Sequence, residues 1–244
     1  MNCRWRSTCT RLLLGWALLT SAIPLASTMP APRKGKLPHD LAEILSRMNE
    51  TAKHLRTVAA SLEYTKVTVL VNDKSTEYGQ LFYHKTKNPE NPEIRIEIQK
   101  PESKVILFKK NKAEIYLPKI NQIQEYNLEE RSGLVQQFLL LGFGSETGEL
   151  RKSYDLKFLK EEDLDGDTTA LLELTPRKES IAAQVAKIRI WISEESWLPV
   201  QQEFFEPGGD YLIARYTTVK VNRAISSSTF EIHPANGAKR VKMN

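Results

Sequence analysis

Apolar and polar residues alternate with a period of two over much of the chain, and this pattern limits the possible folds more than any other feature. It is clearest at residues 94–99, where three isoleucines alternate with Arg, Glu and Gln, and it returns at residues 62–65, 78–83 and 188–192. Successive side chains of a β-strand point to opposite faces of a sheet. The spacing therefore predicts antiparallel strands with one apolar face and one hydrated face.

Two turns divide the pattern into hairpins: a Lys-Asn-Lys turn at residues 110–112 and an Asp-Gly turn at residues 165–166. Short polar turns between apolar runs are typical of antiparallel neighbours. With the segments above, about ten to eleven strands are expected in total. The further strands are expected at residues 67–71, which continue 62–65, and at residues 105–108, 114–117, 122–126, 154–160, 170–175, 200–205 and 211–221, and residues 230–232 and 239–242 close the chain.

Two segments have the spacing of helices. Apolar residues from Leu41 to Leu55 recur every three or four positions, and Asp40 is placed to cap the first turn. Residues 134–143 are apolar on nearly every side, so a helix there must be buried on several faces. That helix either closes the core or forms a lid over a cavity for an apolar ligand. The expected fold class is α+β, built on one large curved antiparallel sheet.

The N-terminal segment has the layout of a signal peptide. Arginines precede an apolar run at residues 12–25, no acidic residue occurs before Asp40, and small residues allow cleavage anywhere from Ala26 to Ala31. An uncleaved N-terminal anchor is the alternative. The expected limits are a signal peptide at residues 1–26, a Pro-rich basic connector at 27–38 and a single domain at 39–244.

The charge of the exported part is nearly balanced. Cleavage removes three of the 35 basic side chains and none of the 30 acidic ones, which lowers the formal charge from +5 to +2. The lysines of residues 85–110 are interspersed with glutamates, so nucleic acid is not an expected partner. Both cysteines, Cys3 and Cys9, lie in the removed segment. This excludes a thiol nucleophile, a disulfide and thiolate metal ligands from the exported chain.

The sequence contains no recognisable catalytic or metal-binding motif. Its four histidines have no neighbours at metal-ligand spacing, and no Gly-x-Ser-x-Gly sequence occurs. The acidic residues 163–167 lack the spacing of a calcium loop, because Leu174 stands where a carboxylate is needed, and we interpret them as a hairpin turn. We expect no catalytic residue, no metal and no cofactor. A pair of carboxylates acting as general acid and base is the remaining alternative.

The order of these segments resembles the LolA-type family of periplasmic carriers, which move lipoproteins to the bacterial outer membrane. No single segment is specific, but their order extends over roughly 170 residues. The segments that carry the resemblance are the N-terminal helix and residues 78–82, 94–101, 114–118, 121–122, 171–176, 188–192, 198–200, 210–211, 222 and 230.

The resemblance implies an incomplete, half-open antiparallel β-barrel whose helices cover an apolar cavity that accepts acyl chains without covalent chemistry. Proteins of this type close the lid through an arginine that precedes a proline. This sequence has lysines before Pro89, so Lys85 and Lys87 are the candidates for lid contacts, although lysine lacks the planar fork of arginine. The residues implied to bind ligand, in the cavity and its lid, are Phe82, Ile94, Ile96, Ile98, Leu134, Phe138, Leu139, Leu141 and Phe143.

The resemblance also implies partners and a location. The ligands would be acylated lipoproteins or lipids, loaded by an inner-membrane release machinery and passed to an outer-membrane acceptor by a periplasmic monomer. Two alternatives stay open at this point. The chain could be a periplasmic regulatory module that senses lipids or lipoproteins, or an extracytoplasmic hydrolase that uses carboxylates.

Overall fold

A single sheet of twelve strands organises the protein. The computed structural model describes residues 40–88, 92–128, 141–144 and 147–243. The order of the strands in the sheet is β12-β6-β5-β4-β3-β2-β1-β11-β10-β9-β8-β7. All neighbours are antiparallel except β12 and β6, which are parallel. The bounds are β1 Thr57–Thr68, β2 Asp73–His84, β3 Glu93–Lys100, β4 Lys104–Lys109, β5 Lys112–Leu117, β6 Gln122–Asn127, β7 Tyr154–Leu164, β8 Asp167–Pro176, β9 Lys187–Ser193, β10 Pro199–Phe205, β11 Tyr211–Val221 and β12 Lys239–Met243.

The expected open antiparallel sheet is confirmed, with twelve strands where about ten to eleven were expected from the turn signals. Both expected hairpins form, because β4 pairs with β5 and β7 pairs with β8. The acidic turn between β7 and β8 is a hairpin turn, in which the Gly166 amide donates to the Asp163 carboxylate at 2.9 Å.

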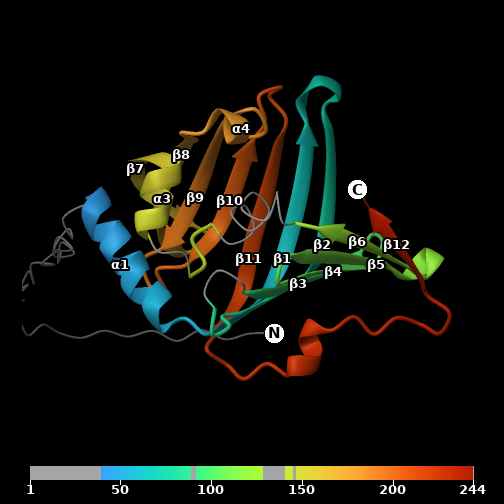
Figure 1. The fold of residues 1–244 in the computed structure, drawn as a ribbon. Helices are drawn as coiled ribbons and strands as arrows, with labels where there is room; N and C mark the ends of the chain where they lie inside the picture. The colour runs from blue at the N-terminus through green and yellow to red at the C-terminus, as the bar shows by residue number, and fades with distance from the viewer. Residues whose placement is uncertain (1–39, 89–91, 129–140, 145–146, 244) are drawn as a thin grey trace, which may run out of the picture. The chain divides into compact units, whose positions relative to one another are not determined.

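Strand β1 joins the two halves of the sheet. It pairs with β2 along its whole length and with β11 on its other edge (Figure 1). One half of the sheet then contains β2–β6 and β12, and the other half contains β7–β11. The β1–β11 ladder is therefore the seam between the two halves.

Helix α1 (Leu41–His54) covers the inner face of the β7–β10 half. It begins at Asp40, whose carboxylate accepts a hydrogen bond from the Glu43 amide at 2.7 Å, as the sequence predicted. Its apolar face contributes Ile44, Leu45 and Met48 to a buried cluster that contains Leu172, Ile188 and their strand neighbours. Burial of this apolar face therefore holds α1 against the sheet.

Two further short helices, α3 (Thr147–Ser153) and α4 (Glu179–Ala182), flank the C-terminal strands. Three single 3-10 turns, η1 (Val69–Val71), η2 (Pro118–Ile120) and η3 (Ser227–Phe230), lie between strands. The expected signal peptide, the connector and most of the expected second helix lie outside the described residues. No helix among the described residues is long and apolar enough to cross a membrane.

Two sequence predictions differ from the structure. Residues 67–71 were expected to form a strand, but β1 ends at Thr68 and the next three residues form the η1 turn at the tip of the β1–β2 hairpin. Leu70 at this tip is 93% exposed. Residues 141–143, the described end of the expected second helix, form a turn and a bend instead of a helix. An apolar segment can fill a turn as well as a strand, so composition alone does not separate them.

Gly79 is required where β2 and β3 approach each other. The β2–β3 register shifts between Tyr78 and Gly79, and a Cβ atom at Gly79 would lie 2.0 Å from the backbone oxygen of Glu97. A glycine at such an irregularity permits close backbone contact and increases the local bend of a sheet. Gly79 therefore lets β2 and β3 stay paired across this irregularity.

Replacing Gly79 with alanine should lower the free energy of unfolding by roughly 1–3 kcal/mol, because the new methyl group can be accommodated only by moving β3. Chemical denaturation measures the change. Gly208→Ala is the matched control, since a Cβ at Gly208 has no neighbour within 4 Å. Equal stability of the two variants would contradict the close contact.

Candidate ligand-binding cavity

A cavity of about 550 Å³ lies on the inner face of the sheet. Its lining comes from both halves of the sheet and from the segment after α4. This volume is in the range of small-molecule binding sites in proteins. The lining residues are Leu62, Tyr64, Glu77, Leu81, Ile96, Ile98, Lys104, Ile106, Phe108, Gln184, Val185, Gln202, Phe204, Glu206, Leu212, Ala214 and Tyr216.

The seam between β1 and β11 supplies the middle of the lining. Leu62 lies opposite Tyr216, and Tyr64 lies opposite Ala214, so these side chains share one face of the sheet. The residues between them in β1, such as Glu63, point to the other face. The period-two pattern of the sequence is therefore the direct cause of an apolar wall at this position.

A buried amide, Gln202, interrupts the apolar wall. Its side chain is 0% exposed. The Tyr216 hydroxyl donates to its Oε1 at 2.9 Å, and its Nε2 donates to the backbone oxygen of Leu141 at 2.5 Å. Phe143 packs edge-to-face on Tyr216, with ring centroids 4.9 Å apart. These contacts fix residues 141–144 against β10 and β11.

The acidic and basic residues of the lining include one ion pair. Lys104 Nζ lies 2.7 Å from Glu77 Oε1. Burial raises the pKa of the Tyr64 phenol, and the charges of Glu77 and Glu206 raise it further. Tyr64 is therefore a neutral hydroxyl group at physiological pH.

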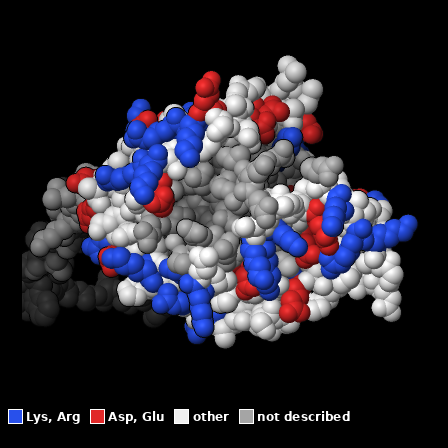
Figure 2. All heavy atoms as spheres, viewed as in Figure 1, with Lys and Arg blue, Asp and Glu red and all other residues white. Residues whose placement is uncertain are grey.

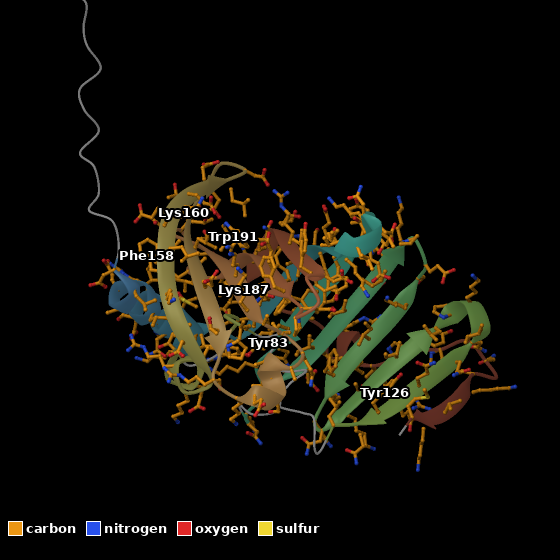
Figure 3. The ribbon with its side chains drawn as sticks, turned by 90° about the horizontal axis from the view of Figure 1, so that it is seen from above. Tyr83, Tyr126, Phe158, Lys160, Lys187 and Trp191 are labelled. Atoms are coloured by element: carbon orange, nitrogen blue, oxygen red, sulfur yellow. The ribbon has the colours of Figure 1, made fainter. Side chains whose placement is uncertain are left out.

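Three tyrosines pack deep in the interior. Burial raises the pKa of Tyr83 and Tyr154 to about 12 and raises that of Tyr216 well above its usual value. The Tyr154 hydroxyl is buried with no hydrogen-bond partner in the described part of the chain. Figure 3 shows Tyr83 near the middle of the molecule, whereas Tyr126, a residue of β6, lies toward the end of the sheet that β12 closes.

The structure places the residues expected in the cavity at different depths. Ile96 and Ile98 line it. Ile94 is on the same face of β3 but is 0% exposed in the core cluster beside the cavity, together with Phe143. Leu141 is buried in the cluster under α1.

Phe82 differs from its expected placement. Leu81 lines the cavity and Tyr83 is in the core, so the residue between them points to the opposite face of β2. The sequence predicted the strand, but the strands that pair with it decide which of its two faces lies on the inside of the sheet. Leu134, Phe138 and Leu139 lie outside the described residues.

The two lysines proposed for lid contacts occupy other surroundings. Lys85 Nζ donates to the backbone oxygen of Ala52 at 3.1 Å, in the last turn of α1. A positive charge there is favourable, because the carbonyl groups at the end of a helix carry partial negative charge. Lys87 is exposed. Lys85 thus supports α1, and its role in a lid stays a prediction.

Sequence reasoning missed Gln202, Tyr216 and Ala214 as lining residues. The strands that hold them were expected, and the alternation of Leu212, Ala214 and Tyr216 marks one face of β11. What the sequence lacked was the pairing of β11 with β1, which turns that face toward the cavity.

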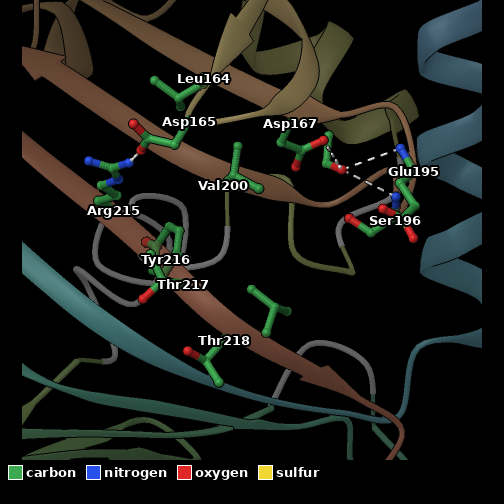
Figure 4. Close-up of a pocket in the computed structure, with 12 residues that line it drawn as sticks. Leu164, Asp165, Asp167, Glu195, Ser196, Val200, Arg215, Tyr216, Thr217 and Thr218 are labelled. Atoms are coloured by element: carbon green, nitrogen blue, oxygen red, sulfur yellow. Dashed lines mark hydrogen bonds and ion pairs between the residues drawn. The ribbon is translucent and has the colours of Figure 1, made fainter. Parts of the chain in front are cut away.

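A second, more polar hollow lies beside the β7–β8 turn (Figure 4). Arg215 of β11 forms an ion pair with Asp165 there. Ser193 Oγ donates to Asp167 Oδ1 at 3.1 Å and accepts from the amides of Glu195 and Ser196. In these hydrogen bonds the polar groups of the turn after β9 pair with each other and with Asp167, which holds the turn in place. Within the described ranges, no three His, Cys, Asp or Glu side chains gather as a metal site would require.

Figure 2 shows that basic side chains on the visible face alternate with acidic ones. A nucleic-acid surface requires a continuous basic patch. The described residues on this face form no such patch.

Replacing Gln202 with leucine should lower the free energy of unfolding by roughly 1–3 kcal/mol, because the Tyr216 hydroxyl and the Leu141 carbonyl both lose their partner. Urea denaturation measures the loss. Gln201→Leu serves as the control, since Gln201 lies on the other face of β10, where its amide donates to Glu203. Similar losses in the two variants would show that the buried amide has no special role.

Stability should fall in alkaline solution. Tyrosine in an unfolded chain has a pKa of about 10, so the folded state holds its phenolic protons more tightly. The stabilisation from Tyr83, Tyr154 and Tyr216 is complete below about pH 10 and is lost as pH rises toward the folded pKa values.

Tyr154→Phe tests this titration at one site. The variant should be at least as stable as the parent near neutral pH, because it removes a buried hydroxyl without a partner among the described residues, and should lose less stability between about pH 10 and pH 12. Denaturant unfolding at several pH values measures both effects. A steeper alkaline loss in the variant would contradict the assignment.

A search among curated proteins gave no match to this sequence. Among solved structures, an uncharacterized conserved protein from Thermus thermophilus is similar over 83% of this chain and 98% of its own, with 14% identity and a TM-score of 0.53. MucB is similar over 79% of this chain, with 12% identity and a TM-score of 0.51. The chain spans about 62% of that MucB structure and about 60% of the chain that it matches in the Pseudomonas aeruginosa MucA/MucB complex.

These likenesses establish a shared fold and no shared activity. NE2245 from Nitrosomonas europaea, a LolA superfamily protein, aligns with 77% of this chain and 97% of its own, at 16% identity and a TM-score of 0.37. The fold expected from the LolA-type resemblance is confirmed by the open sheet itself. A family model described as "Uncharacterized protein" matches residues 101–231, more than half of the chain. The protein belongs to that family.

Proposed function

We propose that this protein binds the acyl chain of a lipid or of an acylated polypeptide in the cavity at the β1–β11 seam. The observation that carries the proposal is the apolar wall of this cavity, to which strands from both halves of the sheet contribute. Among the described lining residues, ten are aliphatic or aromatic without a polar group. Such a lining favours hydrocarbon over polar ligands.

Acyl binding in this cavity is a matter of affinity and involves no bond chemistry. Each buried CH₂ group contributes about 0.8 kcal/mol, so a chain of moderate length binds firmly and still exchanges with a membrane. A carrier needs this balance. We therefore propose a carrier that is not an enzyme and that uses no cofactor.

The proposed carrier works in the periplasm. Residues 1–26 would direct export, 27–38 would form a connector, and residues from 39 onward would form the binding domain, in keeping with the basic and apolar N-terminus. The route we propose runs from an inner-membrane release machinery to an outer-membrane acceptor, with the protein acting as a monomer. Leu134, Phe138 and Leu139 would cover the ligand.

A regulatory module that senses lipid is the second candidate. It is favoured by the similarity in fold to MucB, a protein whose solved complexes contain MucA. The two candidates differ in what the bound lipid does. A carrier releases its ligand to an acceptor membrane, whereas a sensor changes its affinity for a protein partner when the lipid binds.

Filling the cavity should abolish binding. Ala214→Phe places a ring among the lining residues, and we expect its affinity for cis-parinaric acid, a fluorescent fatty acid, to fall at least about tenfold. Ile213→Phe is the control, because Ile213 lies on the other face of β11. Thermal unfolding of both variants shows whether the fold is kept. Unchanged binding by a folded Ala214→Phe variant would exclude this cavity as the site.

Mass spectrometry of the mature protein, purified without detergent, distinguishes the ligands. A co-purifying acylated polypeptide would identify a lipoprotein carrier, and free lipid would favour lipid transport or sensing. If no apolar ligand is found, and none binds when added, the proposal fails.

A further inference from the structure

The charged residues of the cavity lining lie near one of its ends, together with Tyr64. Tyr64 and Glu77 face each other across β1 and β2, and Lys104 lies opposite Ile98 at the start of β4. Glu206 directly follows the end of β10. Tyr64 and Glu77 lie in the half of β1 and β2 next to their hairpin tip, Lys104 reaches Glu77, and Glu206 follows the end of β10 that pairs with Tyr211. We name Tyr64, Glu77, Lys104 and Glu206 the polar rim.

The other end of the cavity is apolar. Leu81, Ile96 and Phe108 line it, and Tyr83 and Phe143 pack in the same core cluster with exposed fractions of 3% or less. A long amphiphile can satisfy both ends only with its hydrocarbon tail among these residues and its head group at the polar rim.

The polar rim carries more negative than positive charge. Lys104 is neutralised by Glu77 at 2.7 Å. The Glu206 amide donates to the Asp210 oxygen at 2.8 Å, which fixes the backbone, but the Glu206 carboxylate has no ion-pair partner among the described residues. The four described rim residues therefore carry a net charge of −1, from two carboxylates and one ammonium. Such a rim attracts a cationic group and disfavours a head group that is only anionic.

The polar rim also has hydrogen-bond donors, which can bind a second, anionic group of the same head group. The Tyr64 hydroxyl has no hydrogen-bond partner in the described part of the chain, and the Lys104 ammonium keeps donors beyond the one used by Glu77. Both can donate to a phosphate oxygen, which accepts strongly. A carboxylate without an ion pair and two hydrogen-bond donors together match a zwitterion.

We propose that the ligand is a phospholipid whose head group carries a primary ammonium, bound with the ammonium at Glu206 and the phosphate at Tyr64 and Lys104. This inference rests on the proposed function and names the head group of the same ligand. A primary ammonium donates hydrogen bonds to a carboxylate, which a quaternary ammonium cannot do. The polar rim thus prefers an ethanolamine head group to choline or glycerol.

Displacement of cis-parinaric acid tests the preference, with phosphatidylethanolamine, phosphatidylcholine and phosphatidylglycerol of identical acyl chains as competitors. The parent protein should bind the ethanolamine lipid roughly tenfold more tightly than the glycerol lipid. Glu206→Gln should bring this ratio close to one while cis-parinaric acid still binds. Glu63→Gln should keep the preference, because Glu63 is adjacent to Tyr64 in sequence but lies on the outer face of β1.

The outcomes separate the two proposals. Equal binding of the three lipids by the parent, or an ethanolamine preference that survives in Glu206→Gln, overturns the head-group assignment and leaves acyl binding intact. Tighter binding of a diacylated peptide with a free amino terminus than of any phospholipid also overturns the lipid assignment. Failure of both cis-parinaric acid and the lipids to bind overturns the proposed function together with this inference.

Discussion

The side chain of Gln202 connects three parts of the molecule that are distant in sequence. It accepts a hydrogen bond from Tyr216 of β11 and donates one to the backbone at Leu141, while its own strand pairs with β9 and β11. A buried amide without partners would destabilise an apolar interior, so all three groups are held in one arrangement. The position of Phe143 depends on the same arrangement, because its ring packs on Tyr216. Residues 141–144 are thus held in place by polar contacts within an apolar interior.

The cavity is a consequence of how the sheet is covered. Helix α1 packs its apolar face on the inner side of the β7–β10 half, where it completes one buried cluster. A second cluster forms from side chains of β1–β5 and β11, with Leu55, Leu128, Phe143 and Leu198 added from outside the strands. The cavity borders both clusters, since Ile96 belongs to one and Phe204 to the other. The interior is therefore divided between packed core and a volume open to a ligand.

The sequence predicted the elements much better than their arrangement. The period-two pattern located most strands, and the helix cap at Asp40 was correct to the residue because capping depends on local chemistry. Phe82 shows the limit, since a shift of one residue moves every side chain of a strand to the other face. The register shift at Gly79 and the burial of Gln202 also depend on neighbours distant in sequence. Those neighbours are set by the pairing of β1 with β11, which no local pattern encodes.

That seam has a consequence for how the chain acquires its structure. Thr57–Thr68 can pair with β2 as soon as the next hairpin is made, but its other partner is Tyr211–Val221, near the end of the polypeptide. Contacts between such distant segments slow folding, because a long loop must close before they form. Until then, β1 presents an unpaired edge that can pair with other chains. A polypeptide that emerges with its N-terminus first would expose this edge of β1 through most of its synthesis or translocation. The last third of the sequence, which contains β11, therefore protects the first third from aggregation.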